Sequence, residues 1–397
     1  MHLPSERVHR EMRSEGASVW VVPANFGEEI AILIKAPSSS LKAIISGCRL
    51  EILLGRIESF LCSAIRIYDV PESPLIVSGV VKHQEEIESL AKLSKDKRSP
   101  AFLFNEMDVS VAWADITISE DSALQIQSLL SNPDQIFTGE FGSAASAALD
   151  SFCWSTDKTQ EYENVVEIPI TTVELKSKTW TSNTNMFIGV GVSQKLKIDD
   201  PDEGEVLERA VWASLESVFP LSIFKSPNVE IGNKVRELTD ILTFHTYGHF
   251  MIEAKDLSVL SSGFERDMNR RVSGVKKQIK KAIKQLVGSC KAVSRGEKIT
   301  DSKGNEIVFD REKVPHCIVL VTEMMHFGEW GDIEEMMVTA MQETGAFFHL
   351  MDLREFITIL KGSRGKPELF DYNLMVRCEE CVKLRSLHVR SLITPNN

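Results

Sequence analysis

Three residues whose types suit phosphate chemistry lie close together in the second half of the chain. Glu253 and Lys255 stand two positions apart in FMIEAK, and Asp240 stands in LTDILTF, before the turn HTYGH. Both segments are short and mainly apolar, which predicts paired strands at 238–244 and 249–255. Side chains alternate along a strand, so Glu253 and Lys255 share one face, and the tight turn brings Asp240 near them. The sequence therefore predicts a patch of two carboxylates and one ammonium group.

This patch is suited to the hydrolysis of a phosphodiester bond. Hard divalent cations such as Mg²⁺ take oxygen ligands and usually keep several waters. We expect Asp240 and Glu253 to hold the metal ion, which activates a water molecule and stabilises the charge that builds up on the phosphate during attack. Lys255 is expected to position that water or to neutralise the transition state. The alternative without chemistry is a surface ion pair of Glu253 with Lys255.

A basic helix is predicted after the two strands. Between Phe264 and Lys298 there are eleven Lys or Arg and three Asp or Glu, whereas the whole chain has a formal net charge of −12. Apolar residues recur here at three- and four-residue spacing, which predicts that one side of the helix packs on a sheet. Lys277, Lys281 and Lys284 fall outside this apolar seam and are expected to contact a phosphate backbone without reading its sequence. The alternative is a solvated helix face.

The segments around the patch alternate between helix and strand. An amphipathic helix is predicted over 205–219, after the helix-start residues of DDPDEG, and the following KSPNVEIGN is expected to be a loop. Further along, we expect a hairpin at 298–309, strands at 316–323 and 346–351, and helices at 332–344 and 353–361. This alternation predicts an α/β fold with a mixed sheet covered by helices on both faces.

These residues, in this order of elements, resemble the PD-(D/E)XK nuclease superfamily, with its restriction-endonuclease-like fold, and most of all its Mrr-like and RecB-like members. The resemblance covers about residues 200–360. It implies a Mg²⁺-dependent endonuclease that cuts DNA, with Mn²⁺ as the alternative metal ion, in defence, restriction or repair. It also implies that Glu208 of GEVLERAV is a third metal ligand and that Gln278 of the basic helix lies at the nucleic-acid interface. Thr239 stands where the family motif often has Pro.

The N-terminal half predicts a separate mixed α/β domain without a catalytic motif. Its expected elements are a hairpin at 19–34, a helix or in part a strand at 49–62, a buried strand at 75–81, a helix at 82–98, a strand at 109–118 and a helix at 121–131. Small residues at 142–151 and polar residues at 155–164 predict a boundary, so the expected domains are 1–160 and 161–397. Three alternating runs at 165–198 predict a small antiparallel sheet. The N-terminal domain is expected to recognise a trigger, bind a partner protein or form a homo-oligomer.

Composition limits the class of protein. Hydrophobic residues make up 43% and charged residues 26% of the chain, which are ordinary globular values. No apolar run approaches ~20 residues, so neither a transmembrane helix nor a membrane partner is expected. The charged N-terminus lacks the apolar region of a secretory signal. Seven scattered cysteines fit reduced thiols in the cytoplasm better than a disulfide framework.

Two other groups have the spacing of metal ligands. His245 and His249 lie four positions apart around a turn rather than on a helix, which favours a surface role. Cys378 and Cys381 have no second cysteine or histidine pair to complete a zinc site. Two alternatives to an active DNA nuclease stay open. One is an inactive nuclease fold that serves as a scaffold for nucleic acid or protein, and the other is a nuclease that acts on RNA.

Overall fold

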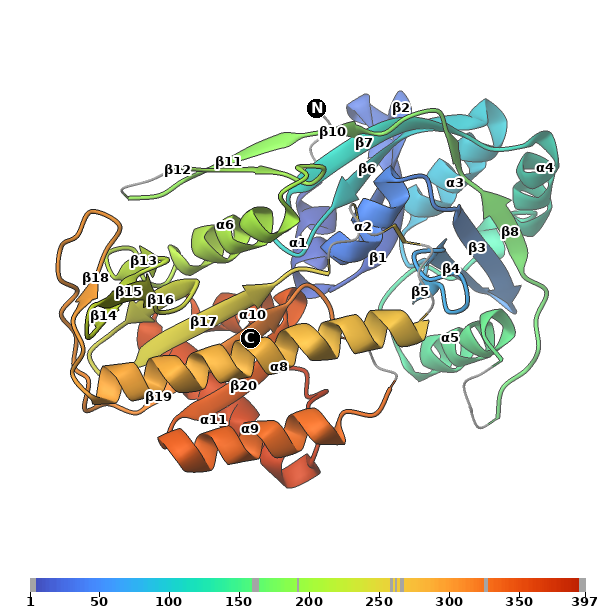
Figure 1. Cartoon of the computed structure of the whole chain (residues 1–397). Helices are drawn as coiled ribbons and strands as arrows, with labels where there is room; N and C mark the ends of the chain where they lie inside the picture. The colour runs from blue at the N-terminus through green and yellow to red at the C-terminus, as the bar shows by residue number, and fades with distance from the viewer. Residues whose placement is uncertain are drawn as a thin grey trace. The chain divides into compact units, whose positions relative to one another are not determined.

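The computed structural model describes residues 5–158, 164–190, 193–257, 260, 263–264, 268–324 and 328–392. The chain forms two compact units, and the mixed α/β class predicted from the sequence is confirmed (Figure 1). Unit 1 comprises the described residues up to Asn183 together with 263–264, and unit 2 comprises the other described residues from Thr184 onward. The division thus falls after Asn183, whereas composition placed it at residue 160, because strands between these positions pair with the sheets of unit 1.

Unit 1 contains a six-stranded sheet in the order β1-β2-β6-β7-β10, with β9 also paired to β7. Its strands are β1 (Ser18–Ala24), β2 (Glu29–Lys35), β6 (Arg98–Phe104), β7 (Ser110–Thr117), β9 (Lys176–Ser177) and β10 (Thr181–Ser182). β2 and β6 run parallel, whereas β1 and β2 form the predicted antiparallel hairpin. A 3-10 turn, η1 (Asn25–Gly27), connects β1 with β2.

A second sheet of unit 1 is antiparallel and has the order β5-β4-β3-β8. Its strands are β3 (Leu50–Ile57), β4 (Phe60–Ile67), β5 (Leu75–Val80) and β8 (Thr171–Glu174). The helix expected over 49–62 is therefore wrong, and the alternative of a strand in part of it is confirmed: the segment is a hairpin whose turn contains Glu58 with a positive φ of 51°. Residues 50–55 are all buried and all but Glu51 are apolar, so the segment contains helical spacing by coincidence. β5 is half-buried rather than buried because it is an edge strand.

Five helices of unit 1 are described: α1 (Glu6–Ser14), α2 (Ser38–Ile45), α3 (Gln84–Asp96), α4 (Glu120–Leu129) and α5 (Ser143–Thr156). A short 3-10 turn, η2 (Pro133–Gln135), follows α4. The helices predicted near α3 and α4 are confirmed. The small-residue stretch 142–151, which was expected to lie with 155–164 in a boundary region, begins α5. Its small residues Ala145 and Ala148 are buried and let the helix pack closely, and Phe152 fills the space above Gly55, where a Cβ would lie 2.8 Å from its ring.

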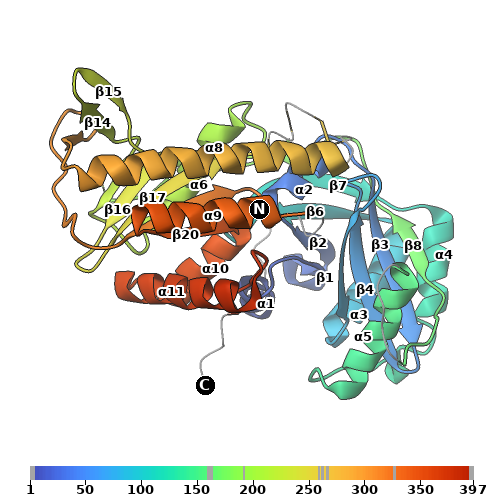
Figure 2. The same cartoon turned by 60° about the horizontal axis from the view of Figure 1, so that its bottom comes forward.

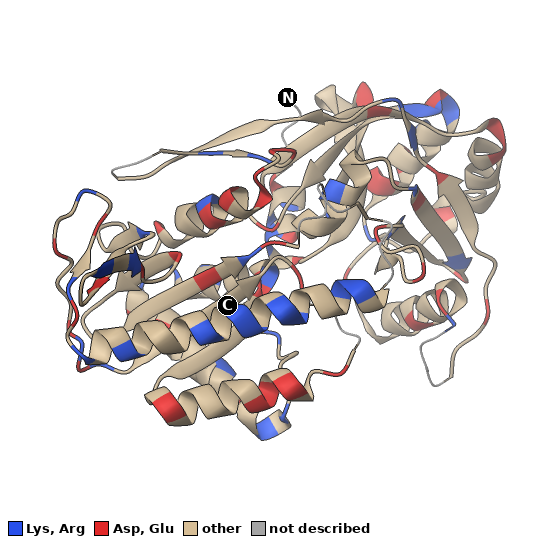
Figure 3. Cartoon of the chain, in the orientation of Figure 1, with Lys and Arg blue, Asp and Glu red and all other residues tan. Residues whose placement is uncertain are grey.

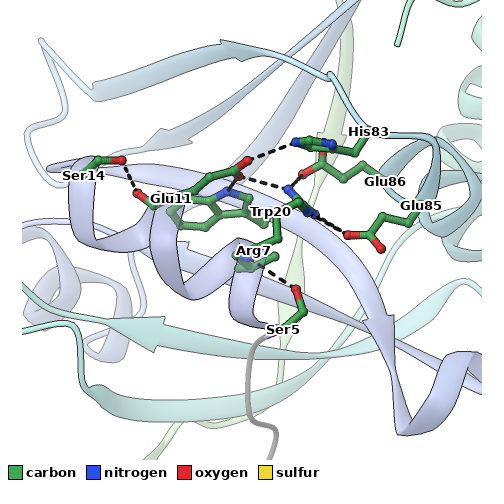
Figure 4. Close-up of polar contacts among 9 residues, drawn as sticks. Ser5, Arg7, Glu11, Ser14, Trp20, His83, Glu85 and Glu86 are labelled. Atoms are coloured by element: carbon green, nitrogen blue, oxygen red, sulfur yellow. Dashed lines mark hydrogen bonds and ion pairs between the residues drawn. The ribbon is translucent and has the colours of Figure 1, made fainter. Parts of the chain in front are cut away.

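Polar contacts tie α1 to α3 (Figure 4). Arg7 of α1 lies 2.5 Å from Glu85 and 3.5 Å from Glu86 of α3. Glu11 of α1 accepts a hydrogen bond from the indole Nε1 of Trp20 at 3.0 Å and lies 3.0 Å from Nε2 of His83. The first helix is therefore fixed to its unit by charge as well as by apolar contact.

Unit 2 is built on a five-stranded sheet in the order β13-β16-β17-β19-β20. Its strands are β13 (Ile223–Lys225), β16 (Ile241–Phe244), β17 (His249–Lys255), β19 (Pro315–Val321) and β20 (Phe347–Asp352). The first three strands are antiparallel, and β17, β19 and β20 are parallel. The sheet is therefore mixed, and β17 is the strand at which the direction of pairing changes.

Helices cover both faces of this sheet (Figures 1 and 2). They are α6 (Glu203–Leu215), α8 (Met268–Ser294), α9 (Gly331–Thr344), α10 (Leu353–Ser363) and α11 (Pro367–Leu384). One core joins the sheet to α8 and α9, for example through Met251, Ile279 and Ile333. On the other face, Phe250 of β17 contacts Phe219, just after α6, and Phe370 of α11. A strand enclosed on both faces reads as an apolar run, and FMIEAK interrupts that run only with Glu253 and Lys255.

Short strands complete unit 2. β14 (Asn228–Ile231) pairs with β15 (Lys234–Glu237) and β18 (Ile299–Thr300), so the loop predicted for KSPNVEIGN is wrong. The single sheet predicted over 165–198 is also wrong. Only β11 (Thr184–Ile188) and β12 (Ser193–Lys197) pair with each other, since β8, β9 and β10 join unit 1.

The seven cysteines are free thiols. Cys290 of α8 and Cys317 of β19 are buried, and their sulfur atoms lie 3.2 Å apart. Burial raises the pKa of the Cys317 thiol well above its usual value, and the neighbouring Cys290 adds to the shift. In the described part of the chain, no helix has the length and apolar character needed to cross a membrane.

Candidate functional site

Asp240 and Glu253 face each other at the carboxyl end of β17. The register pairs Ile241 with Ile252, so Asp240, just before β16, lies opposite Glu253. Oδ2 of Asp240 accepts a hydrogen bond from the backbone N–H of Ala254 at 2.7 Å. The preceding Thr239 donates its hydroxyl to the carbonyl oxygen of Ile252 at 2.8 Å. These contacts hold the Asp240 carboxylate against the end of β17.

Lys255 joins both carboxylates. Its Nζ lies 3.0 Å from Oδ2 of Asp240 and 2.7 Å from Oε2 of Glu253. The side chain of Lys255 is 16% exposed and that of Glu253 only 1%. Breaking a buried ion pair by removing one partner leaves an uncompensated charge, which is costly. The three predicted residues therefore form one electrostatic unit, whereas the alternative of an exposed ion pair does not fit their burial.

The surroundings of Glu253 disfavour the charged form of its carboxyl group. Burial raises its pKa to about 7, and the Asp240 carboxylate adds to the shift, while Lys255 acts in the opposite direction. Although Oε2 lies near Lys255, it accepts no hydrogen bond of good geometry from the described residues. For Lys255, burial would lower the pKa, but the carboxylates of Glu253 and Asp240 outweigh burial and raise it. A cation beside this carboxylate would offset the burial and the Asp240 charge that together raise its pKa.

Glu208 approaches this group from α6. Asp202 caps the helix by accepting a hydrogen bond from the backbone N–H of Glu205 at 3.1 Å. Burial raises the pKa of Glu208 to about 7, and the nearby Asp240 carboxylate adds to the shift, against the influence of Lys225. The structure thus brings Glu208 within electrostatic range of Asp240, as it does Glu253 and Lys255.

Two neighbours of the site were missed in the sequence. Lys225 of β13 lies 2.5 Å from Glu205 and 3.6 Å from Glu208, so it bridges two carboxylates of α6. Glu237, the last residue of β15, raises the pKa of both Glu208 and Glu253. β13 and β15 were not predicted as strands, so nothing placed these side chains. The only local signal was the short apolar pair before Lys225.

The chemistry of this donor set fits a hard divalent cation, because its donors are carboxylate oxygens. Within the described residues, however, no group of three or more His, Cys, Asp or Glu side chains has the arrangement of a metal centre. The ammonium group of Lys255 lies against both Asp240 and Glu253 and offsets part of their charge. Asp240 and Glu253 are the residues that could hold a metal ion, with Glu208 as a further ligand.

A basic groove lies along the first half of α8, where Lys and Arg form a stripe (Figure 3). It has a volume of about 940 Å³ and is lined by Lys276, Lys277, Lys280, Lys281 and Lys284, and by Gly328, Glu329 and Asp332 from the α9 side. Lys277, Lys281 and Lys284 are exposed and form no ion pair with any described residue. Gln278 is exposed but does not line the groove. The structure therefore groups the three predicted lysines and leaves Gln278 apart from them.

The surface role predicted for His245 and His249 is wrong, because both side chains are buried. His245 and His316 each point Nε2 at Asp371 of α11, at 3.0 and 3.1 Å. His316 continues through Nδ1 to Nε2 of His349, at 2.9 Å. His249 starts β17, and its pKa is lowered by burial to about 4. These histidines lie at the amino ends of the parallel strands, and Lys255 lies at the carboxyl end.

The second cysteine-containing group lies on α11. Burial raises the pKa of both Cys378 and Cys381, which disfavours the thiolate form that binds zinc. The two residues therefore behave as partly buried thiols of a helix.

Comparison with known proteins adds no further constraint. No family model matches the chain, and no curated protein and no solved structure matches it either. The arrangement of the residues themselves is the basis for a function.

Proposed function

We propose that unit 2 is a metal-dependent nuclease that hydrolyses phosphodiester bonds in DNA. The observation that carries this is the convergence of Asp240, Glu253 and Lys255 at the carboxyl end of β17, with Lys255 Nζ within 3.0 Å of both carboxylates. Parallel strands commonly present ligand sites at this end. An ion pair without a chemical role is expected at the exposed surface, whereas this one is buried at the end of a central strand.

The order of elements supports a restriction-endonuclease-like core. α6, which carries Glu208, precedes three antiparallel strands that end with β17. α8 then crosses to β19, which is parallel to β17. The resemblance in the sequence implies this succession of a Glu-bearing helix, an Asp, an ExK strand and a basic helix.

In this function Asp240 and Glu253 would hold Mg²⁺ or Mn²⁺, with Glu208 as a further ligand. The ion would supply an activated water and stabilise charge on the phosphate. Lys255 contacts both carboxylates and offsets part of their charge. Its ammonium group is also placed to stabilise charge that would develop on the phosphate.

Nucleic acid is held by the basic groove. Lys277, Lys281 and Lys284 are exposed cations of this groove on one half of α8, whereas Gln278 does not line it. Such contacts bind a backbone independently of sequence. A second candidate is an inactive nuclease fold that binds nucleic acid, favoured by the ion pairing of both Asp240 and Glu253 with Lys255.

The experiment is a titration of Mg²⁺ and Mn²⁺ against labelled DNA and RNA, with wild type and Asp240→Ala prepared identically. Metal-dependent cleavage of DNA by the wild type alone is the expected result. Cleavage of RNA but not of DNA would show that the substrate is RNA instead of DNA. Binding without cleavage at any metal concentration would establish the scaffold instead.

A further inference from the structure

One carboxylate bridges two lysines inside the basic groove. Asp332, in the first turn of α9, lies with Oδ1 at 2.5 Å from Nζ of Lys276 and with Oδ2 at 2.6 Å from Nζ of Lys280. The two lysines stand one helical turn apart on α8, so their ammonium groups project to the same side. Each oxygen of a single anionic group is therefore matched to one ammonium group.

The position of Asp332 is fixed by its surroundings. Lys276 also donates a hydrogen bond to the carbonyl oxygen of Glu329 at 2.6 Å. Gly328 has a positive φ of 95° and lies so close to α8 that a Cβ would come within 2.9 Å of Val272. Residues 328 and 329 are thus seated on α8. They place the start of α9, with the Asp332 carboxylate, over the two lysines.

The other lysines of the groove extend this site along the helix. Lys277, Lys281 and Lys284 have no ion pair with the described residues, whereas Lys276 and Lys280 share Asp332. A phosphodiester group, like a carboxylate, carries one negative charge on two free oxygens. A chain of such groups matches a row of lysines, and a single small anion does not.

We propose that Asp332 occupies a phosphate position of the groove, between Lys276 and Lys280, and that a nucleic-acid backbone competes with it there. This deepens the proposed function, on which the choice of nucleic acid as ligand rests. Asp332 then limits how tightly the groove binds, because two of its five lysines are already paired with a carboxylate when nucleic acid arrives.

The test is Asp332→Asn, with binding of short DNA and RNA oligonucleotides measured in EDTA so that cleavage plays no part. Two partly exposed ion pairs no longer have to be broken, so affinity is expected to rise about 2- to 30-fold. If one more phosphate is held, the slope of log K against log salt steepens by about 0.7–0.9. A gain with DNA, RNA or both supports the phosphate position and identifies the nucleic acid.

Glu343→Gln is the matched control. It removes the same charge from the same helix, where Glu343 pairs with Lys291 of α8 outside the groove. Adding Lys276→Ala and Lys280→Ala to the Asp332→Asn protein should cancel the gain, and thermal unfolding checks that each variant is folded. Equal affinities for Asp332→Asn and Glu343→Gln would overturn the proposal, as would an equal gain with polyglutamate. The metal titration tests cleavage separately, so the proposed phosphate position and the proposed nuclease activity can each be overturned without the other.

Discussion

The carboxylate of Asp240 lies 3.0 Å from the ammonium group of Lys255. In the sequence, the turn between β16 and β17 separates the two residues. This contact makes the charge state of the site depend on a single lysine. Without Lys255, Asp240 and Glu253 would face each other as two uncompensated anions, and like charges at this range raise a carboxyl pKa. A bound cation would relieve the same repulsion, so Lys255 and a metal ion are alternative partners of one pair of carboxylates.

The first prediction concerns catalysis. Asp240→Ala and Lys255→Ala should each reduce cleavage at least ~10²-fold, the scale for losing one preorganised electrostatic group. Rates are measured on labelled DNA at saturating Mg²⁺. Lys313→Ala, an exposed lysine of the same unit, is the control and should leave the rate unchanged. Turnover at the wild-type rate by Asp240→Ala would remove this residue from the mechanism.

A second prediction concerns metal binding and stability. A ligand that binds only the native state stabilises it, so Mg²⁺ or Mn²⁺ should raise the Tm of the wild type. Glu208→Gln should reduce that shift because one ligand is weakened, and Asp240→Ala should nearly abolish it. A thermal-shift titration compares the three proteins. The same metal-induced shift in all of them would place the ion elsewhere.

The lysines of the groove give a third prediction. If Lys277, Lys281 and Lys284 each contact a phosphate, changing all three to Ala should lower the salt slope of binding by about 0.7–0.9 per contact. Binding should weaken equally for unrelated sequences. The matched control changes three exposed lysines outside the groove, Lys303, Lys313 and Lys366. A slope equal to that of the control would show that the groove lysines are only solvated.

The fourth prediction concerns acid stability. Burial would raise the pKa of Asp371, but hydrogen bonds from His245 and His316 outweigh it and hold the pKa well below its usual range. A lowered carboxyl pKa contributes stability that is complete above the unfolded value of about 3.9 and is lost as the pH falls below it. Asp371→Asn should therefore lower the free energy of unfolding at pH 7 by about 1.5–3 kcal/mol, the range for hydrogen bonds to a charged group.

Urea unfolding at several pH values checks this effect. The difference between wild type and Asp371→Asn should persist at pH 5 and shrink below about pH 4. Glu379→Gln changes an exposed carboxylate of the same helix and should have little effect at either pH. A difference that stays constant down to pH 2 would assign the loss to packing rather than to ionisation.

The sequence predicted features that depend on a single segment and missed those that depend on pairing between segments. Alternation in FMIEAK and the apolar seam of α8 are properties of single segments, so Glu253, Lys255 and the exposed lysines were placed correctly on their elements. Lys225 and Glu237 were missed because β13 and β15 are short and are defined by pairing with other strands. The hairpin of β3 and β4 was mistaken for a helix because burial on both faces hides the two-residue period of a strand.

Chemical labelling of the buried thiols of Cys290 and Cys317 would also measure how often α8 separates from β19. Neither thiol is open to solvent, so an alkylating reagent reaches them only in molecules where the helix has lifted from the strand. The ratio of their labelling rate to the intrinsic rate of an exposed thiol then gives the free energy of that local opening. The partly buried Cys153, Cys378 and Cys381 provide a comparison in the same chain that does not require α8 to separate from β19. Because α8 carries the groove lysines on its outer side, a bound nucleic-acid backbone is expected to stabilise this helix against local opening. Slower labelling in the presence of nucleic acid would measure that stabilisation.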